Sequence, residues 1–255
     1  MAYRYLFEQM VRRELRQKYR GSALGVLWYV VNPLVLMGAY YLMFGVIFKG
    51  AASERDYPLF LLVGLIVWVF FSQAVLSAAP SLLEHGALVR KARFPRETIP
   101  ASVVTVHLVT FLALLALIAP VTIAIRGTVD VALLMLPLIL ACLFAFVLGF
   151  ALAVSILHAY FRDVAPILSA ALLPWFFVSP IFFRPERIAH QPAARFVLEW
   201  VNPVAPFIGA VRDVLYWGIV PGPAQLAYVV VVAALALLVG HRLFRRLQGE
   251  LAVVV

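Results

Sequence analysis

Six long stretches of the chain contain no Asp, Glu, Lys or Arg, and they constrain its fold more than any other feature. The stretches are residues 21–48, 57–83, 98–125, 131–161, 164–183 and 214–241. Each is at least as long as the roughly 20 residues with which a helix crosses about 30 Å of hydrocarbon. The sequence therefore predicts an all-α integral membrane protein with six transmembrane helices, at 24–48, 57–80, 99–125, 131–158, 164–183 and 224–241.

The composition excludes a soluble globular protein. Only 13% of the residues are charged and the mean hydropathy is +1.00, whereas about a quarter of the residues of a soluble domain are charged. The six predicted spans use nearly all of the 255 residues. We therefore expect a single transmembrane domain over 1–255, with no folded domain outside the membrane.

The distribution of Lys and Arg predicts the orientation of the chain. With six spans, the two termini, the loop after the second span and the turn after the fourth share one side of the membrane. That side holds 14 of the 21 basic residues, and such an excess marks the cytoplasmic face. Both termini are therefore predicted to be cytoplasmic. The net charge of +9 is then explained by topology and by contact with anionic membrane lipids, and no nucleic-acid partner is expected.

Residues 2–20 are predicted to form an amphipathic helix that lies in the membrane interface. Tyr3, Phe7, Val11 and Leu15 recur at helical spacing, and basic residues occupy another face. Such a helix buries its apolar side among the lipids and keeps its charges in water. Because these residues are charged rather than continuously apolar, they are not a cleavable signal peptide.

A basic segment, residues 81–97, separates the second and third predicted spans. It contains Arg90, Lys91, Arg93 and Arg96, and Pro95 prevents a helix over 81–92 from continuing. A stiff cytoplasmic helix that bears on a partner explains both the charges and the prolines. A basic anchor that only fixes the orientation is the alternative, and it explains the charges alone.

The apolar segment 185–222 is interrupted too often to cross the membrane. Glu199, Arg212, Asp213 and several prolines lie within it. Irregular backbone at membrane depth must be buried in protein or line a cavity. We therefore predict re-entrant or interfacial helices on the external side. On the cytoplasmic side, Arg162 and Asp163 are predicted to form a tight turn between the fourth and fifth spans.

The chain has no motif that would cleave a nucleotide. None of its three lysines follows a glycine, so the phosphate-binding loop G-x-x-x-x-G-K-[ST] is absent. Its five histidines are too scattered to suggest a metal site. Within the spans only His107 and His158 are candidates to relay a coupling ion, and we expect each to pack with a hydrogen bond. We therefore predict a protein that is not an enzyme, holds no cofactor and depends on another subunit for energy.

Aromatic residues are concentrated in three of the predicted spans. A conduit lined by aromatic faces would suit sliding contact with sugar rings, because such faces combine apolar contact with a polar edge. The alternative is ordinary packing and the aromatic belts found at membrane interfaces, which we expect for most of these residues. The candidates for the conduit are Trp28, Tyr29, Tyr40, Phe44, Trp68, Phe71, Trp175 and Phe176.

Four segments spread over nearly the whole chain carry a family pattern. They are "VRRELRQKYRGSALGVLWYVVNPL" (11–34), "SLLEHGALVRKARFPRETIP" (81–100), "LHAYFRDVAPIL" (157–168) and "WVNPVAPFIGAVRDVLYWG" (200–218). In this order they resemble the membrane subunit of ATP-binding-cassette exporters of bacterial cell-surface polysaccharides such as O-antigen and teichoic acid, the type-2 family. The combination of Y-[RK]-x-S-x-L-G-x-L-W, K-x-x-F-P-R and F-R-D is specific, whereas each motif alone would be weak.

The resemblance implies a homodimer in the bacterial plasma (inner) membrane, with two cytoplasmic ATPase subunits that bind ATP and Mg. It implies that 84–91 is the coupling helix that docks on the ATPase, that 2–20 lies near the lipid entrance, and that 185–222 lies at the external exit. The implied substrate is a glycan on a polyprenyl-pyrophosphate carrier. The expected coupling residues are Glu84, His85, Gly86, Leu88, Val89, Arg90 and Lys91, with Arg162 and Asp163 as a second cytoplasmic contact.

Two hypotheses concern the residues of the predicted cytoplasmic face, and other functions are alternatives to export of a polysaccharide. Leu88 and Val89 would pack into the ATPase, and lipid pyrophosphate would meet guanidinium groups, which fork well onto phosphate. The phosphate candidates are Arg16, Arg20, Arg93 and Arg96. The rivals are an exporter of drugs or small lipids, a membrane-embedded glycosyl- or acyltransferase, and a scaffold that transports nothing.

Overall fold

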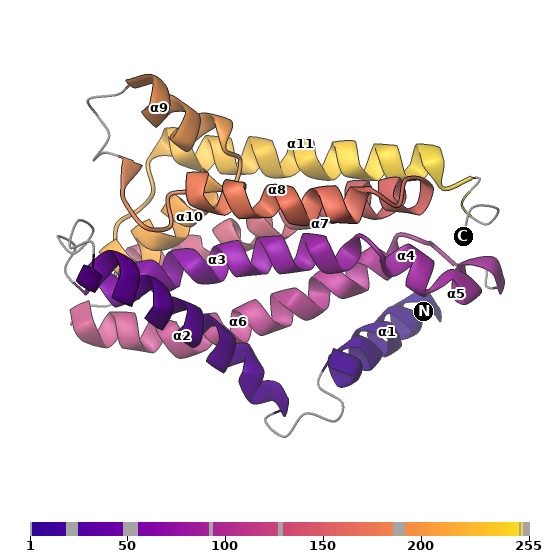
Figure 1. Cartoon of the computed structure of the whole chain (residues 1–255), viewed down its shortest axis with the longest axis horizontal. Coiled ribbons are helices and arrows are strands. Elements are labelled where there is room, and N and C mark those ends of the chain that lie inside the picture. The colour runs from indigo at the N-terminus through magenta and orange to yellow at the C-terminus, as the bar shows by residue number, and fades with distance from the viewer. Residues whose placement is uncertain are drawn as a thin grey trace.

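The computed structural model describes residues 2–18, 25–47, 56–91, 94–126, 130–185, 192–249 and 251, and this part of the chain is helical without a strand. The long helices run roughly along one direction and form an elongated bundle (Figure 1). The predicted all-α membrane class is therefore confirmed.

Within the described residues, four helices are long and apolar enough to cross a membrane: Tyr57–Ala78, Thr98–Ile125, Val131–Tyr160 and Pro223–Leu247. The first is α3, and the second belongs to α6 (Thr98–Arg126). The third combines a 3-10 turn, η3 (Val131–Met135), with α7 (Leu136–Tyr160), and the last is α11. They lie where the sequence predicts the second, third, fourth and sixth spans.

The other two predicted spans are shorter helices. α2 (Trp28–Tyr40) continues as a π-helix, η2 (Tyr41–Ile47), and α8 comprises only Val164–Val178. At 1.5 Å per residue α8 is about 22 Å long, less than the about 30 Å of the hydrocarbon core. It ends early because Ser179 precedes Pro180 and is extended, with φ −83° and ψ 143°, since a following proline disfavours helical backbone. The count of six crossings stays a prediction.

Helix α3 forms the centre of the bundle. It contacts α2, α6, α7, α8 and α10, and side chains on all of its faces are buried. A helix that is apolar all round is stable when other helices surround it. This explains why residues 57–78 carry neither a charge nor a polar face.

Helices α7 and α11 pack directly against each other through two glycines. A Cβ atom on Gly240 would overlap the carbonyl group of Gly149, and a Cβ atom on Gly149 would overlap the backbone at Ala236. Small residues at a helix interface let two backbones approach closely in lipid, where apolar burial alone gives little attraction.

The segment after α8 folds into short helices at one end of the bundle. These are α9 (Pro192–Phe196), η5 (Val197–Val201), α10 (Ala205–Arg212) and η6 (Asp213–Trp217). α10 is buried against α3, α7 and α11. Short broken helices are what the sequence predicts here, and their re-entrant position in the membrane stays a prediction.

The opposite end of the bundle gathers α1 (Ala2–Lys18), α4 (Ser81–Glu84), α5 (Gly86–Lys91) and the last turns of α11 (Figure 1). α1 packs on α6. The helix predicted over 81–92 is two helices, because the backbone breaks at His85, with φ −99° and ψ 22°. One hydrophobic cluster unites these elements; its buried members are Met10, Leu82, Val89, Ile99, Leu152, Ile156, Ala159, Phe244 and Leu251.

Candidate functional site

The segment formed by α4 and α5 packs one face against the rest of the chain and leaves the other face exposed. Glu84, Ala87 and Arg90 are exposed, three residues apart. Leu82 and Val89 lie on the other side and are buried, at 0% and 2% exposure. We call α4 and α5 the coupling segment after their predicted role, and the exposed residues Glu84, Ala87 and Arg90 its outer face.

Val89, which is predicted to pack into the ATPase, is buried within this chain in the structure. Its side chain belongs to the hydrophobic cluster of this chain, and Leu88 is half-buried against the same cluster. An apolar residue in a short amphipathic helix faces the nearest apolar surface, and here α1, α6, α7 and α11 supply that surface. Val89 therefore anchors the segment. Gly86 is also buried, so neither Gly86 nor Val89 is available to a partner in this conformation.

His85 connects the coupling segment to α1. Its Nδ1 atom lies 2.9 Å from the carbonyl oxygen of Ser81, and its Nε2 atom lies 3.2 Å from Oε1 of Glu14. The side chains of His85 and Glu14 are 15% and 24% exposed, so the pair is partly shielded from water. His85 is thus engaged within the chain and links α1 to the turn between α4 and α5.

The residues after the coupling segment hold the end of α11. Arg96 donates a hydrogen bond from Nη1 to the carbonyl oxygen of Gln248. Oε1 of Glu97 lies 3.4 Å from Nδ1 of His241 and 3.6 Å from Nε of Arg245. Arg96, a predicted phosphate contact, therefore has a guanidinium group already engaged with α11.

The other predicted cytoplasmic residues are placed only in part. Arg162 and Asp163 are exposed in the turn between α7 and α8, beside the exposed Phe161. Arg20 and Arg93 lie outside the described residues, as do the side chains of Arg16 and Lys91.

The predicted conduit aromatics are mostly part of the protein's own core. Trp68, Phe71 and Phe176 are 5%, 0% and 6% exposed. Rings from α2, α3 and α8 contact one another there. The distance between ring centroids is 5.3 Å for Tyr40 and Phe176, 6.1 Å for Trp68 and Trp175, and 5.2 Å for Phe71 and Trp175.

Trp68, Phe71 and Phe176 fill space between helices of one chain, and a place for them on the conduit stays a prediction. Tyr40, Phe44 and Trp175 are half-buried in the same cluster, and the side chain of Tyr29 is not among those described. Trp28 is 44% exposed, more than the other predicted aromatics whose side chains are described.

The two histidines of the predicted spans pack with hydrogen bonds, as expected. Nε2 of His107 lies 3.1 Å from Oγ of Ser77. The backbone N–H of Ala165 donates to Nδ1 of His158 at 3.3 Å.

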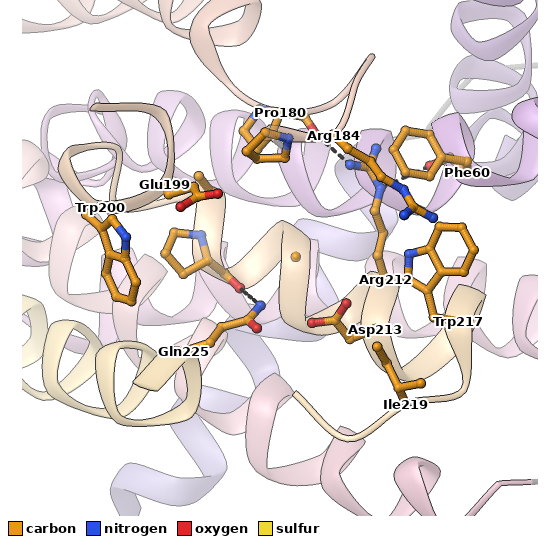
Figure 2. A pocket seen from close by; sticks show the side chains of 14 residues that line it. Phe60, Pro180, Arg184, Glu199, Trp200, Arg212, Asp213, Trp217, Ile219 and Gln225 are labelled. Atoms are coloured by element: carbon orange, nitrogen blue, oxygen red, sulfur yellow. Dashed lines mark hydrogen bonds between the residues drawn. The ribbon is translucent and has the colours of Figure 1, made fainter. Parts of the chain in front are cut away.

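A cavity at the opposite end of the bundle was not predicted from the sequence. It measures about 520 Å³ and lies among α3, the segment after α8, η5, α10, η6 and the start of α11 (Figure 2). Phe60, Trp200 and Trp217 supply aromatic groups to its lining, and Arg184, Glu199, Arg212, Asp213 and Gln225 supply polar ones.

Arg212 holds this end of the bundle together. It is 5% exposed, and its guanidinium group donates to the carbonyl oxygens of Phe60, Pro180 and Ile181. The group also lies over the ring of Phe60, 3.7 Å from the centroid. A charge inside a broken apolar stretch is the signal in the sequence that marks such a site, because buried charges need specific partners.

The fold defines a multi-pass α-helical membrane protein with a partly exposed coupling segment at one end and a polar, aromatic cavity at the other. Residues 5–216 match the ABC-2 type transporter family. The chain belongs to this family.

Curated relatives align over nearly the whole chain. The chain is 29% identical to the O-antigen export system permease protein RfbA of Myxococcus xanthus over 250 residues, covering 98% of this chain and 95% of the relative. It is 28% identical to the protein of the same name from Klebsiella pneumoniae, covering 77% and 80%. It is 25% identical to the polysialic acid transport protein KpsM of Escherichia coli, covering 93% and 92%.

Proposed function

We propose that this chain is the transmembrane subunit of an ATP-driven exporter that moves a lipid-linked polysaccharide out of the bacterial cytoplasm. The observation that carries this proposal is the alignment over 98% of the chain with a relative named as an O-antigen export permease. O-antigen, teichoic acid or a similar glycan on a polyprenyl carrier is the proposed substrate. Two copies of the chain would form the conduit.

The energy would come from two separate ATP-binding-cassette subunits that bind ATP and Mg in the cytoplasm. The sequence of this chain has no phosphate-binding loop. The basic end of the bundle would face the cytoplasm, because most Lys and Arg residues fall on that side of the predicted topology. The cavity beside Arg212 would then lie at the external end.

The outer face of the coupling segment would be the surface that docks on the ATPase. Glu84, Ala87 and Arg90 are exposed there, and a mixed-charge face suits an ionic and hydrogen-bonded contact whose register is set by charge complementarity. Arg162 and Asp163 would add a second contact.

The inner side of the segment would transmit the movement that docking produces. Val89 is inserted into the cluster of α1, α6, α7 and α11, and His85 is held to Glu14 of α1. Closely packed interiors transmit a displacement instead of absorbing it. A movement of α5 would therefore displace these four helices, rather than only the two spans that flank the segment.

Charges near this end would guide the lipid carrier. Arg16, Arg20 and Arg93 are the proposed contacts for its pyrophosphate, since guanidinium groups bind phosphate in a forked geometry. Arg96 would act mainly as a tie to α11 because its guanidinium group already donates to Gln248.

Charge reversal on the outer face tests this proposal. The double change Glu84→Arg and Arg90→Glu should leave the protein folded in the membrane, because both side chains are exposed, and should abolish co-purification of the ATPase and export of the glycan. Glu8→Arg, a matched change at an exposed position on α1, is the control and should retain the ATPase. Full co-purification with the double variant would refute the docking role of this face.

A further inference from the structure

The cavity beside Arg212 has a lining that the export mechanism above does not use. Trp200 and Trp217 lie on opposite sides of it, and Glu199, Asp213 and Gln225 lie between them in the view (Figure 2). Its volume of about 520 Å³ falls within the range of about 300–1,000 Å³ that is typical of small-molecule sites.

We propose that this cavity is a saccharide-binding subsite that holds a short stretch of the exported glycan as it leaves the conduit. The inference rests on the proposed function, because the glycan must reach this end of the bundle to be bound there. It adds a specific contact between this chain and its substrate.

The aromatic groups favour the apolar faces of sugar rings. Trp200 is on the rim, with 36% exposure, and its ring is fixed by an edge contact with Tyr228 at 5.4 Å. The guanidinium group of Arg184 lies 3.6 Å from the centroid of the Trp217 ring, so it fixes this ring and covers one of its two faces. Rigid rings with an apolar face and a polar edge bind such ligands with little loss of conformational entropy.

The polar groups favour hydroxyls. Carboxylates accept hydrogen bonds, whereas amide and guanidinium groups donate them, and a sugar hydroxyl can do both. Glu199 is oriented by Nε of Arg195 at 2.8 Å, and Gln225 donates to the carbonyl oxygen of Pro206 at 3.3 Å. Donors and acceptors are therefore fixed around the same space.

The balance of charge favours a neutral ligand over a phosphate group. Two carboxylates, Glu199 and Asp213, line the cavity together with Arg184 and Arg212. The hydrogen-bond donors of Arg212 are engaged with three carbonyl oxygens and are not free for a phosphate, and the carboxylate of Asp213 would repel an anion at contact distance. A neutral ligand rich in hydroxyl groups avoids this repulsion and uses both kinds of group.

The walls of the cavity are preorganised by Arg212. Its three carbonyl partners belong to α3 and to the turn after α8, so α10 is fixed relative to both elements. A site formed before its ligand arrives binds without first ordering its walls.

Two neighbouring residues allow a matched test by photo-crosslinking in cells. Ile219 and Val220 are both 55% exposed, and Ile219 lines the cavity whereas Val220 is not part of its lining. A photoreactive benzophenone amino acid is placed at each position in turn, and adducts between protein and carbohydrate are measured after illumination. We expect strong adducts from position 219 and weak ones from position 220.

Two further cell lines identify the source of the carbohydrate. Adducts from position 219 should disappear in cells that cannot assemble the glycan, and also in cells that make the glycan but lack the ATPase. Adducts that persist in cells without the glycan would show that another sugar occupies the cavity, which would contradict the inference. Equal adducts from both positions, or adducts with phospholipid alone, would also overturn it while leaving export and the proposed function intact.

A ring substitution supplies an independent measurement. Trp200→Leu, combined with the crosslinker at 219, should reduce the carbohydrate adduct roughly tenfold, the effect of removing one stacking ring from a site. Phe196→Leu removes a ring that is 60% exposed and not part of the cavity lining, and it should leave the adduct unchanged. Equal effects of the two substitutions would contradict a site at Trp200.

Discussion

The Nε2 atom of His85, between α4 and α5, lies 3.2 Å from Oε1 of Glu14 on α1. This contact joins the coupling segment to the N-terminal helix, although 70 residues separate them in the sequence. An ATPase that moves the segment would therefore move α1 as well, and with it the region proposed to admit the lipid carrier.

Removing this contact should separate ATP hydrolysis from export. In Glu14→Ala or His85→Ala, the ATPase should still bind and hydrolyse ATP, while export falls because α1 no longer follows α5. The free energy of unfolding should change by at most about 1 kcal/mol, since the pair is partly exposed. ATPase activity and exported glycan, measured in the same cells, check this expectation. Glu8→Ala on the same helix is the control, and normal export in both His85→Ala and Glu14→Ala would contradict the role of the contact.

Val89 should matter for folding rather than for docking. Val89→Asp places a charge at a position that is 2% exposed, and a charge buried without a partner is strongly destabilising. We expect little folded protein in the membrane. Val89→Ala should lower the free energy of unfolding by about 2 kcal/mol, through lost burial and a small cavity.

Ala87→Asp is the matched comparison for Val89→Asp. Ala87 is exposed two residues earlier, so this variant should fold normally and lose ATPase association. Thermal unfolding in detergent and co-purification distinguish the two variants. Identical behaviour of Ala87→Asp and Val89→Asp would show that the two faces of the segment are assigned incorrectly.

The glycine contact between α7 and α11 should be sensitive to a single methyl group. Gly240→Ala would force the two backbones apart, because the new Cβ atom overlaps the carbonyl of Gly149. Overpacking of this kind costs about 1–3 kcal/mol, which should appear as a lower melting temperature. Gly38→Ala on α2 meets no heavy atom within 4 Å and should be neutral or slightly stabilising, since alanine favours helix.

Loss of Arg212 should destabilise the end of the bundle that holds the cavity. Arg212→Leu leaves three buried carbonyl oxygens without their donor, and we expect a loss of about 3 kcal/mol or more. Arg212→Lys should retain only part of the free energy of unfolding that Arg212→Leu loses, because an ammonium group cannot reproduce the planar, forked geometry of a guanidinium group. Arg195→Leu removes an arginine whose side chain is 41% exposed in its ion pair and should cost at most about 1 kcal/mol. Equal stability of Arg212→Leu and Arg195→Leu would contradict the anchoring role of Arg212.

The sequence was sufficient to predict the helical membrane class, because a long apolar stretch without a charged residue satisfies its backbone in lipid by forming a helix. It could not define the end of α8. Residues 179–183 are as apolar as those before them, and the extended backbone at Ser179 depends on the following proline and on carbonyls that bind Arg212. Apolar length alone therefore overestimates this helix.

Which side chains face outward was harder to predict. Val89 and Trp68 are apolar, and an apolar residue can contact either a partner or the core of its own chain. Which of the two it contacts depends on how the neighbouring helices pack, and the sequence of the segment does not give this. Val89 and Trp68 are both buried in the chain's own clusters. The cavity combines residues from α3 to α11, so no local motif marks it, although the charge at Arg212 in an apolar stretch points to its location.

The most direct test of the account is transport by purified protein in vesicles loaded with the lipid-linked glycan. We expect passage of the glycan when this chain is reconstituted with its ATPase and ATP, and none with this chain alone or with an ATPase whose phosphate-loop lysine is replaced by alanine. ATP-dependent passage that survives in the absence of a functional ATPase subunit would contradict the claim that the chain is driven by a separate motor at its coupling segment.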